Sequence, residues 1–165
     1  MNKNEMIEKW FQLYSDDIYQ YFFYRVSIND AEDFVQEVFI RAFNSIDSFR
    51  EESQVRSWLL SIARNLAIDE YRNFKKKRPF VGTNVNERIN DDKTPDIIYE
   101  RGENVERLYK AVAELKPSFK DVVILYGIKE LSIQEVASIL NWSENKVSYT
   151  FHRACKKLKS LVEAN

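Results

Sequence analysis

The chain has 165 residues, of which 44% are hydrophobic and 14% aromatic, enough apolar material for one domain or two small ones. Its formal net charge is −1, and its single cysteine, Cys155, excludes an intramolecular disulfide. Because no apolar run approaches the length of a membrane span and the start lacks a signal-peptide pattern, we expect no membrane insertion and a location in the cytoplasm.

Helical spacing of apolar residues dominates residues 1–74. A first helix is followed by a second over residues 30–44, for which Asn29 is the predicted N-cap with Glu32 completing a capping box. After a polar break, a long third helix is predicted. Its buried stripe should hold Trp58, Leu59, Ile62, Ala63, Leu66 and Ala67.

The periodicity is lost over residues 75–104, which begin with a basic run and continue as a mostly acidic, polar stretch. Such a length is too great for an ordinary connection inside one compact domain. We therefore predict an all-α protein of two small helical domains, residues 1–74 and 105–165, joined by a flexible linker over residues 75–104.

Two helices joined by a short turn are predicted near the end of the chain. Pro117 suits the first turn of the helix before them, and Ser132 with Glu135 forms a capping box for the first of the pair. The last helix is basic, with five Lys or Arg against one Glu in residues 144–159. This is the helix-turn-helix pattern of DNA-binding proteins, although an ordinary helical hairpin with a solvated basic face remains an alternative.

Three segments resemble one known family. Residues 30–46 read DAEDFVQEVFIRAFNSI and closely resemble the polymerase-docking helix of region 2 in extracytoplasmic-function sigma factors of the sigma-70 family. Residues 49–72 read FREESQVRSWLLSIARNLAIDEYR and resemble that family's −10 recognition and promoter-melting segment. Residues 131–159 are similar to its region 4 helix-turn-helix, which reads the −35 element. The segments occur in the family's order, on the two sides of the predicted linker.

The resemblance implies a sigma factor that directs core RNA polymerase to promoters through sigma regions 2 and 4, with no enzymatic activity of its own. The implied partners are core polymerase, through the β′ clamp helices and the β flap, promoter DNA, and an anti-sigma factor in the bacterial cytoplasm. No catalytic residue, cofactor or metal site is implied.

Individual positions can be carried over from the family's motifs. Asp33, Gln36 and Glu37 are implied to contact the clamp helices, although by themselves they could be a solvated acidic face. The implied pocket for a flipped −10 base consists of Phe49 and Asn65. The implied contacts in the −35 major groove are Ser148, Tyr149, His152 and Arg153.

This sequence departs from the family's pattern at three positions. Glu51 stands where the family often has glycine, which puts the shape of the loop after Phe49 in question. Ser148 and Thr150 stand where a basic residue is common, so −35 contacts are expected to be fewer or altered.

Two other functions are compatible with parts of the chain. An autonomous helix-turn-helix repressor or activator would explain the C-terminal half but gives no role to residues 30–72. An enzyme would need a phosphate loop, an activated nucleophile or a metal cluster, and the sequence offers none of these. His152, the only histidine, has no second His or nearby Cys in a ligand pattern, so it is not expected to bind metal.

Overall fold

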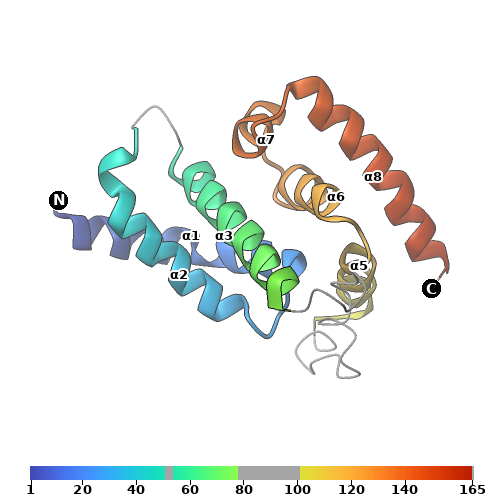
Figure 1. Ribbon diagram of the computed structural model, residues 1–165, viewed down its shortest axis with the longest axis horizontal. Helices are drawn as coiled ribbons and strands as arrows, with labels where there is room; N and C mark the ends of the chain where they lie inside the picture. Colours follow the sequence, from blue (N-terminus) through green and yellow to red (C-terminus); the bar gives the residue numbers. More distant parts are fainter. Residues whose placement is uncertain (51–53, 78–100, 165) are drawn as a thin grey trace.

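The computed structural model describes residues 1–50, 54–77 and 101–164, and the regular elements in these ranges are all helices (Figure 1). The predicted all-α fold class is therefore confirmed. None of the described helices is long and apolar enough to cross a membrane. The helices form an N-terminal group, α1 to α3, and a C-terminal group, α5 to α8, which pack against each other.

The N-terminal group consists of α1 (Lys3–Arg25), α2 (Ala31–Ser45), the 3-10 turn η1 (Ile46–Ser48) and α3 (Val55–Lys77). Asn2 caps α1, because its side chain accepts a hydrogen bond from the backbone N–H of Glu5 and the Glu5 carboxylate accepts one in return. The apolar second half of α1 lies at the centre of the group. Its fully buried side chains include Ile18, Tyr21, Phe22 and Phe23.

The predicted capping of α2 is wrong. The helix begins at Ala31, its N-cap residue is Asp30, and no side chain caps it. Asp30 has φ −102° and ψ −5°, whereas a side-chain cap usually needs an extended backbone. The backbone N–H of Asn29 instead donates to the Ser27 hydroxyl at 3.1 Å, so local turn bonding replaces the capping box.

The C-terminal group consists of α5 (Glu103–Ala113), α6 (Pro117–Val122), the π-helix η3 (Val123–Ile128), α7 (Ile133–Leu140) and α8 (Glu144–Ala164). Pro117 stands at the start of α6, and the capping box of Ser132 and Glu135 is present at the start of α7. Both sequence predictions are thus confirmed. Asn141 ends α7 with φ 57°, a left-handed conformation that asparagine tolerates and that turns the chain into α8.

The helix that begins at Pro117 changes its hydrogen bonding at Val123. The chain continues as η3, and the N–H of Lys129 bonds to the carbonyl of Ile124, five residues earlier, at 2.7 Å. The widened turn brings Gly127 against α8, where a Cβ on the glycine would lie 3.2 Å from the Phe151 ring. Tyr126 contacts the same ring edge-to-face. The π-helix therefore joins α6 closely to the last helix.

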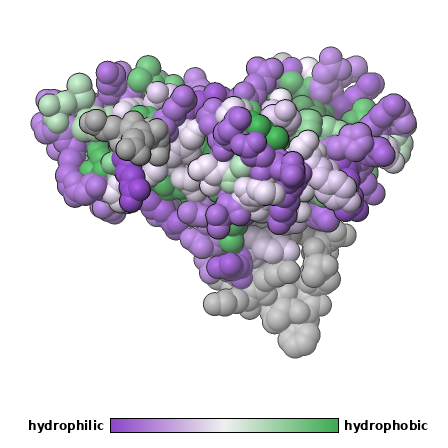
Figure 2. Space-filling model, turned by 90° about the horizontal axis from the view of Figure 1, so that it is seen from above, coloured by the Kyte–Doolittle hydropathy of each residue, from purple (hydrophilic) through white to green (hydrophobic). Residues whose placement is uncertain are grey.

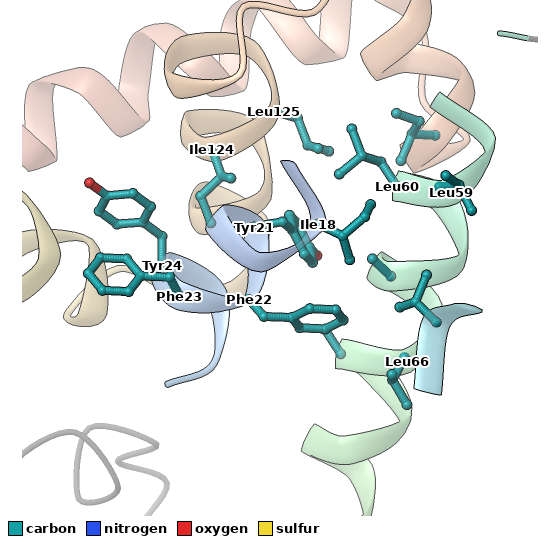
Figure 3. Packing of buried hydrophobic residues seen from close by; sticks show 14 of the residues in the cluster. Ile18, Tyr21, Phe22, Phe23, Tyr24, Leu59, Leu60, Leu66, Ile124 and Leu125 are labelled. Carbon is teal, nitrogen blue, oxygen red and sulfur yellow. The ribbon is translucent and has the colours of Figure 1, made fainter. Parts of the chain in front are cut away.

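One hydrophobic core runs through both groups. Figure 3 shows Ile124 and Leu125 on the side facing α1 and α3, with Ile18, Tyr21 and Leu60 opposite them. Tyr109 of α5 packs on Phe23 with ring centroids 4.8 Å apart. The two predicted domains thus correspond to two helical groups that share an interface in this structure.

The linker prediction falls mainly on residues 78–100, which lie outside the described residues. At its edges, α3 continues to Lys77 and α5 begins at Glu103, so helix occupies residues 75–77 and 103–104 of the predicted linker. Glu51 and the loop around it also lie outside the described residues.

Candidate functional site

One face of α2 combines acidic, amide and exposed apolar side chains. Asp33 and Gln36 are exposed and Glu37 is partly exposed, at spacings that place them on one side of the helix. Ile40, at the next position of that face, is 55% exposed. This face therefore combines an exposed apolar side chain with acidic and amide groups, which is the composition of a protein-docking surface with an apolar centre and a polar rim.

Sequence reasoning overlooked Ile40, although its position could have revealed it. It lies seven residues after Asp33, two turns along the same face, and off the buried stripe formed by Val35, Val38 and Ala42. Arg41 then holds the face in place, because its guanidinium pairs with Glu37 at 3.3 Å and with Asp69 of α3 at 3.2 Å. We call Asp33, Gln36, Glu37 and Ile40 the α2 face.

Phe49 lies in an aromatic cluster. Its ring centroid is 5.3 Å from that of Trp10 and 5.1 Å from that of Trp58, and the side chain is partly buried. The structure therefore places Phe49 in packing contacts with both indoles.

Asn65 is exposed on α3 and lies about 10 Å beyond Trp58 along the helix axis. Trp58, Ile62 and Asn65 follow at spacings of four and three residues, so they share one face. Trp58 and Ile62 were predicted to be buried but are only partly buried, because the stripe assigned from the sequence covers two adjacent faces of α3. Asn65 and Trp58 therefore lie on the same face of α3, two turns apart, and Phe49 packs on the Trp58 indole from the side of η1.

The α8 arc consists of four residues that are all exposed, Ser148, Tyr149, His152 and Arg153. Their helix, α8, lies on the side of the C-terminal group away from α1 to α3 (Figure 1). Tyr149 is 63% exposed, and the Arg153 guanidinium lies over its ring at 5.5 Å. This stacking fixes the arginine near the first half of the helix, the part that meets base edges in helix-turn-helix proteins. Thr150 is buried, so it packs inside the group and offers no side chain to DNA.

The rest of α8 continues the basic surface. Lys156, Lys157 and Lys159 are exposed, as phosphate-contacting lysines must be. Lys146 lies over the Trp142 ring at 4.4 Å, next to the turn between α7 and α8. Within the described residues, no group of three His, Cys, Asp or Glu side chains is arranged to hold a metal ion.

Two matches to known families fall on the two groups of helices. Residues 10–78 match the family described as Sigma-70 region 2, and residues 105–158 match Sigma-70, region 4. The fold and these two matches therefore define a sigma factor with a region 2 and a region 4.

Similar proteins show to which group of sigma factors the chain belongs. The ECF RNA polymerase sigma factor SigX of Bacillus subtilis is 39% identical over 95% of this chain and 86% of its own length. RNA polymerase sigma factor YlaC of the same organism is 35% identical over 96% of this chain and 93% of its own length. The chain belongs to the extracytoplasmic-function (ECF) group of the sigma-70 family, and its function is to direct RNA polymerase to promoters.

Solved structures show the same fold. The sigma factor RpoE, in complex with the anti-sigma factor NepR from Bartonella quintana, matches with a TM-score of 0.76 at 20% identity, over 96% of this chain and 97% of that chain. CnrH, in complex with the cytosolic domain of CnrY, matches with a TM-score of 0.67 at 21% identity, over 99% of this chain and 88% of that chain.

Proposed function

We propose that the α2 face binds the β′ clamp helices of core polymerase, that α3 captures a −10 base, and that the α8 arc reads the −35 element. The observation that carries this proposal is that one chain presents an apolar and acidic docking face on α2 and a basic, exposed helix on α8. A protein-docking surface and a DNA-reading surface in one chain are what a promoter-specificity subunit requires.

Charge supports a division of labour with the polymerase. A self-sufficient DNA-binding protein carries a clear positive excess, because phosphate neutralisation supplies most of its affinity. The net charge here is −1. We therefore infer that core polymerase supplies much of the phosphate-binding surface and that the chain is an initiation factor rather than an enzyme, acting in the bacterial cytoplasm where the polymerase is.

The proposed domain division is residues 1–74 for region 2, 75–104 for the linker and 105–165 for region 4. Residues 78–102, which lie between α3 and α5, can span about 85 Å when extended. The −35 and −10 elements lie about two helical turns apart, roughly 70 Å along B-DNA. One chain can therefore occupy both, with region 4 also contacting the β flap.

Because both solved neighbours above are complexes, one of them named as holding an anti-sigma factor, we include an anti-sigma factor among the partners.

A gel-shift with promoter duplex, with and without core polymerase, tests this function. We expect weak, salt-sensitive and unspecific binding by the chain alone and promoter-specific binding once core is added, since the chain lacks excess positive charge. Nanomolar sequence-specific binding by the isolated chain at physiological salt would instead favour an autonomous repressor or activator.

The α8 arc makes a separate prediction about −35 readout. Arg153→Ala and His152→Ala should change base preference within the −35 element, because loss of a base contact costs about 1–3 kcal/mol at one position. Lys159→Ala should weaken binding to all sequences alike, since a phosphate contact carries no sequence information. The measurement is holoenzyme binding to a promoter set with single −35 substitutions. Identical preference profiles for all three variants would refute the assignment.

A further inference from the structure

A buried charge cluster joins the two groups of helices. The Asp121 carboxylate of α6 accepts hydrogen bonds from the Tyr21 hydroxyl at 2.8 Å and from Arg25 Nε at 3.0 Å, both on α1. Arg64 of α3 approaches the other carboxylate oxygen at 3.6 Å. The Arg25 and Asp121 side chains are each only 5% exposed. Asp121 therefore lies in a pocket made by the N-terminal group.

The hydrogen-bond and ion-pair partners named above for the Asp121 carboxylate all belong to α1 and α3, whereas Asp121 itself is in α6. Its charge is thus compensated across the interface. Burial raises the pKa of Tyr21 well above its usual range, and the neighbouring Asp121 charge adds to this, so the phenol stays a hydrogen-bond donor. If the two groups of helices separated, the side chains of this cluster would be exposed to water. These are Tyr21, Arg25, Arg64 and Asp121.

A second set of polar contacts lies nearer to α7. The Lys129 side chain, positioned by the end of the π-helix, pairs with Asp17 and donates to Gln20 of α1. Arg56 of α3 donates to the Lys129 carbonyl at 3.0 Å, and the Ser57 hydroxyl donates to Glu135 of α7. These contacts and the Asp121 cluster hold α1 and α3 directly against α6 and α7.

The interface is also incompletely satisfied. The buried Nε atoms of Arg56 and Arg64 are ion-paired with Asp17 at 3.2 Å and Asp121 at 3.6 Å, but neither makes a hydrogen bond of good geometry. Lys120 is 2% exposed beside Arg25, and burial together with the Arg25 charge lowers its pKa to about 8. Buried charged groups of this kind regain hydration when the interface opens, and this gain offsets part of the free energy that opening costs. The interface thus combines the apolar contacts described above with charge pairs that are costly to bury, so that loss of one charge pair should shift it toward opening.

The closed arrangement conflicts with the reach that promoter recognition demands. A carboxylate 3.0 Å from an arginine fixes region 4 against region 2, whereas the two promoter elements lie roughly 70 Å apart. We propose that this interface is an autoinhibitory latch, in which Asp121 inserted between Arg25 and Arg64 keeps the chain from engaging the −10 and −35 elements together. The inhibitory consequence rests on the proposed function, but the latch itself does not.

Distances between the two groups test the latch without DNA or polymerase. In a Cys155→Ser background, spin labels at Lys9→Cys on α1 and Ser160→Cys on α8, both exposed positions, report the separation. We expect a narrow distribution for this parent and a broad one, shifted to longer distances, for Asp121→Asn. The matched control is Asp47→Asn, which removes the same charge from an exposed pair with Lys3 inside the N-terminal group and should leave the distribution narrow.

Arg25→Gln provides a second variant should Asp121→Asn fail to fold, as judged by circular dichroism. It should open the chain as well, and the double variant should be no more open than the more open single variant, because both remove the same interaction. An unchanged narrow distribution in the folded variants would overturn the proposal, as would a parent that is already broad. With core polymerase, Asp121→Asn should bind promoter several-fold more tightly. Unaltered promoter binding by an opened variant would overturn only the inhibitory role.

Discussion

Ile40→Asp is expected to abolish stable association with core polymerase while leaving the helical fold intact. Ile40 is 55% exposed, so the substitution disturbs no buried packing. At an interface with the polymerase, by contrast, the apolar Ile40 side chain would be replaced by an Asp carboxylate, which loses its hydration when the two surfaces meet. Anchors of this kind are worth about 2–4 kcal/mol, which is roughly 30- to 700-fold in Kd. Retention on immobilised core enzyme, with circular dichroism to monitor folding, measures the effect.

Val162→Asp on α8 is the matched control, since it places the same charge at another exposed apolar position, 37% exposed and outside the α2 face. It should bind core as the parent does. Asp33→Lys, and Gln36→Ala combined with Glu37→Ala, should also weaken binding, through lost polar and charge complementarity at the rim. If Ile40→Asp is retained as well as Val162→Asp, the α2 face does not dock on the polymerase.

Asn65→Ala is expected to retain core binding and closed-complex formation but to lose −10 selectivity and strand opening. Extruding a base costs a few kcal/mol, and stacking on an aromatic ring returns about 1–3 kcal/mol, so each added contact matters. Asn65 is exposed on the same face of α3 as Trp58, on which Phe49 packs. A base stacked there could be read by the amide.

Permanganate footprinting on duplex promoter measures this opening. Loss of the amide contact should reduce it by roughly 5- to 150-fold, the equivalent of about 1–3 kcal/mol. A pre-melted bubble template should restore much of the activity, because the melting cost has already been met. Asn4→Ala, an exposed asparagine on α1, should open DNA normally. Normal opening by Asn65→Ala on duplex DNA would place the base pocket elsewhere.

Local signals were enough to predict most of the helices. The Ser132 capping box and Pro117 each act within one helical turn, and the structure has both as predicted. The Asn29 cap failed because the helix begins one residue later, after Asp30, whose backbone is helical rather than extended. The outward arc of α8 followed from helical periodicity alone. Figure 2 shows why composition says little about sites here, since the visible face is mostly hydrophilic with small separate apolar patches.

Long-range pairing could not be predicted. Tyr21 and Asp121 are 100 residues apart in the sequence. The residues around each of them give no sign that the two side chains meet in a buried cluster. Trp58 likewise reads as a core residue in sequence, and only the packed structure shows that it is partly exposed beside Trp10 and Phe49. Helix faces are set locally, whereas the choice of face that meets another group depends on the whole fold.

Run-off transcription tests whether this chain gives core RNA polymerase its promoter specificity. Core RNA polymerase is supplied with fragments of the source genome, with and without this chain, and the 5′ ends of the transcripts are mapped. We predict that the chain adds a small set of discrete start sites, preceded by shared −35 and −10 elements, and that Ile40→Asp and Asn65→Ala remove them. Start sites that are the same with and without the chain would contradict the account.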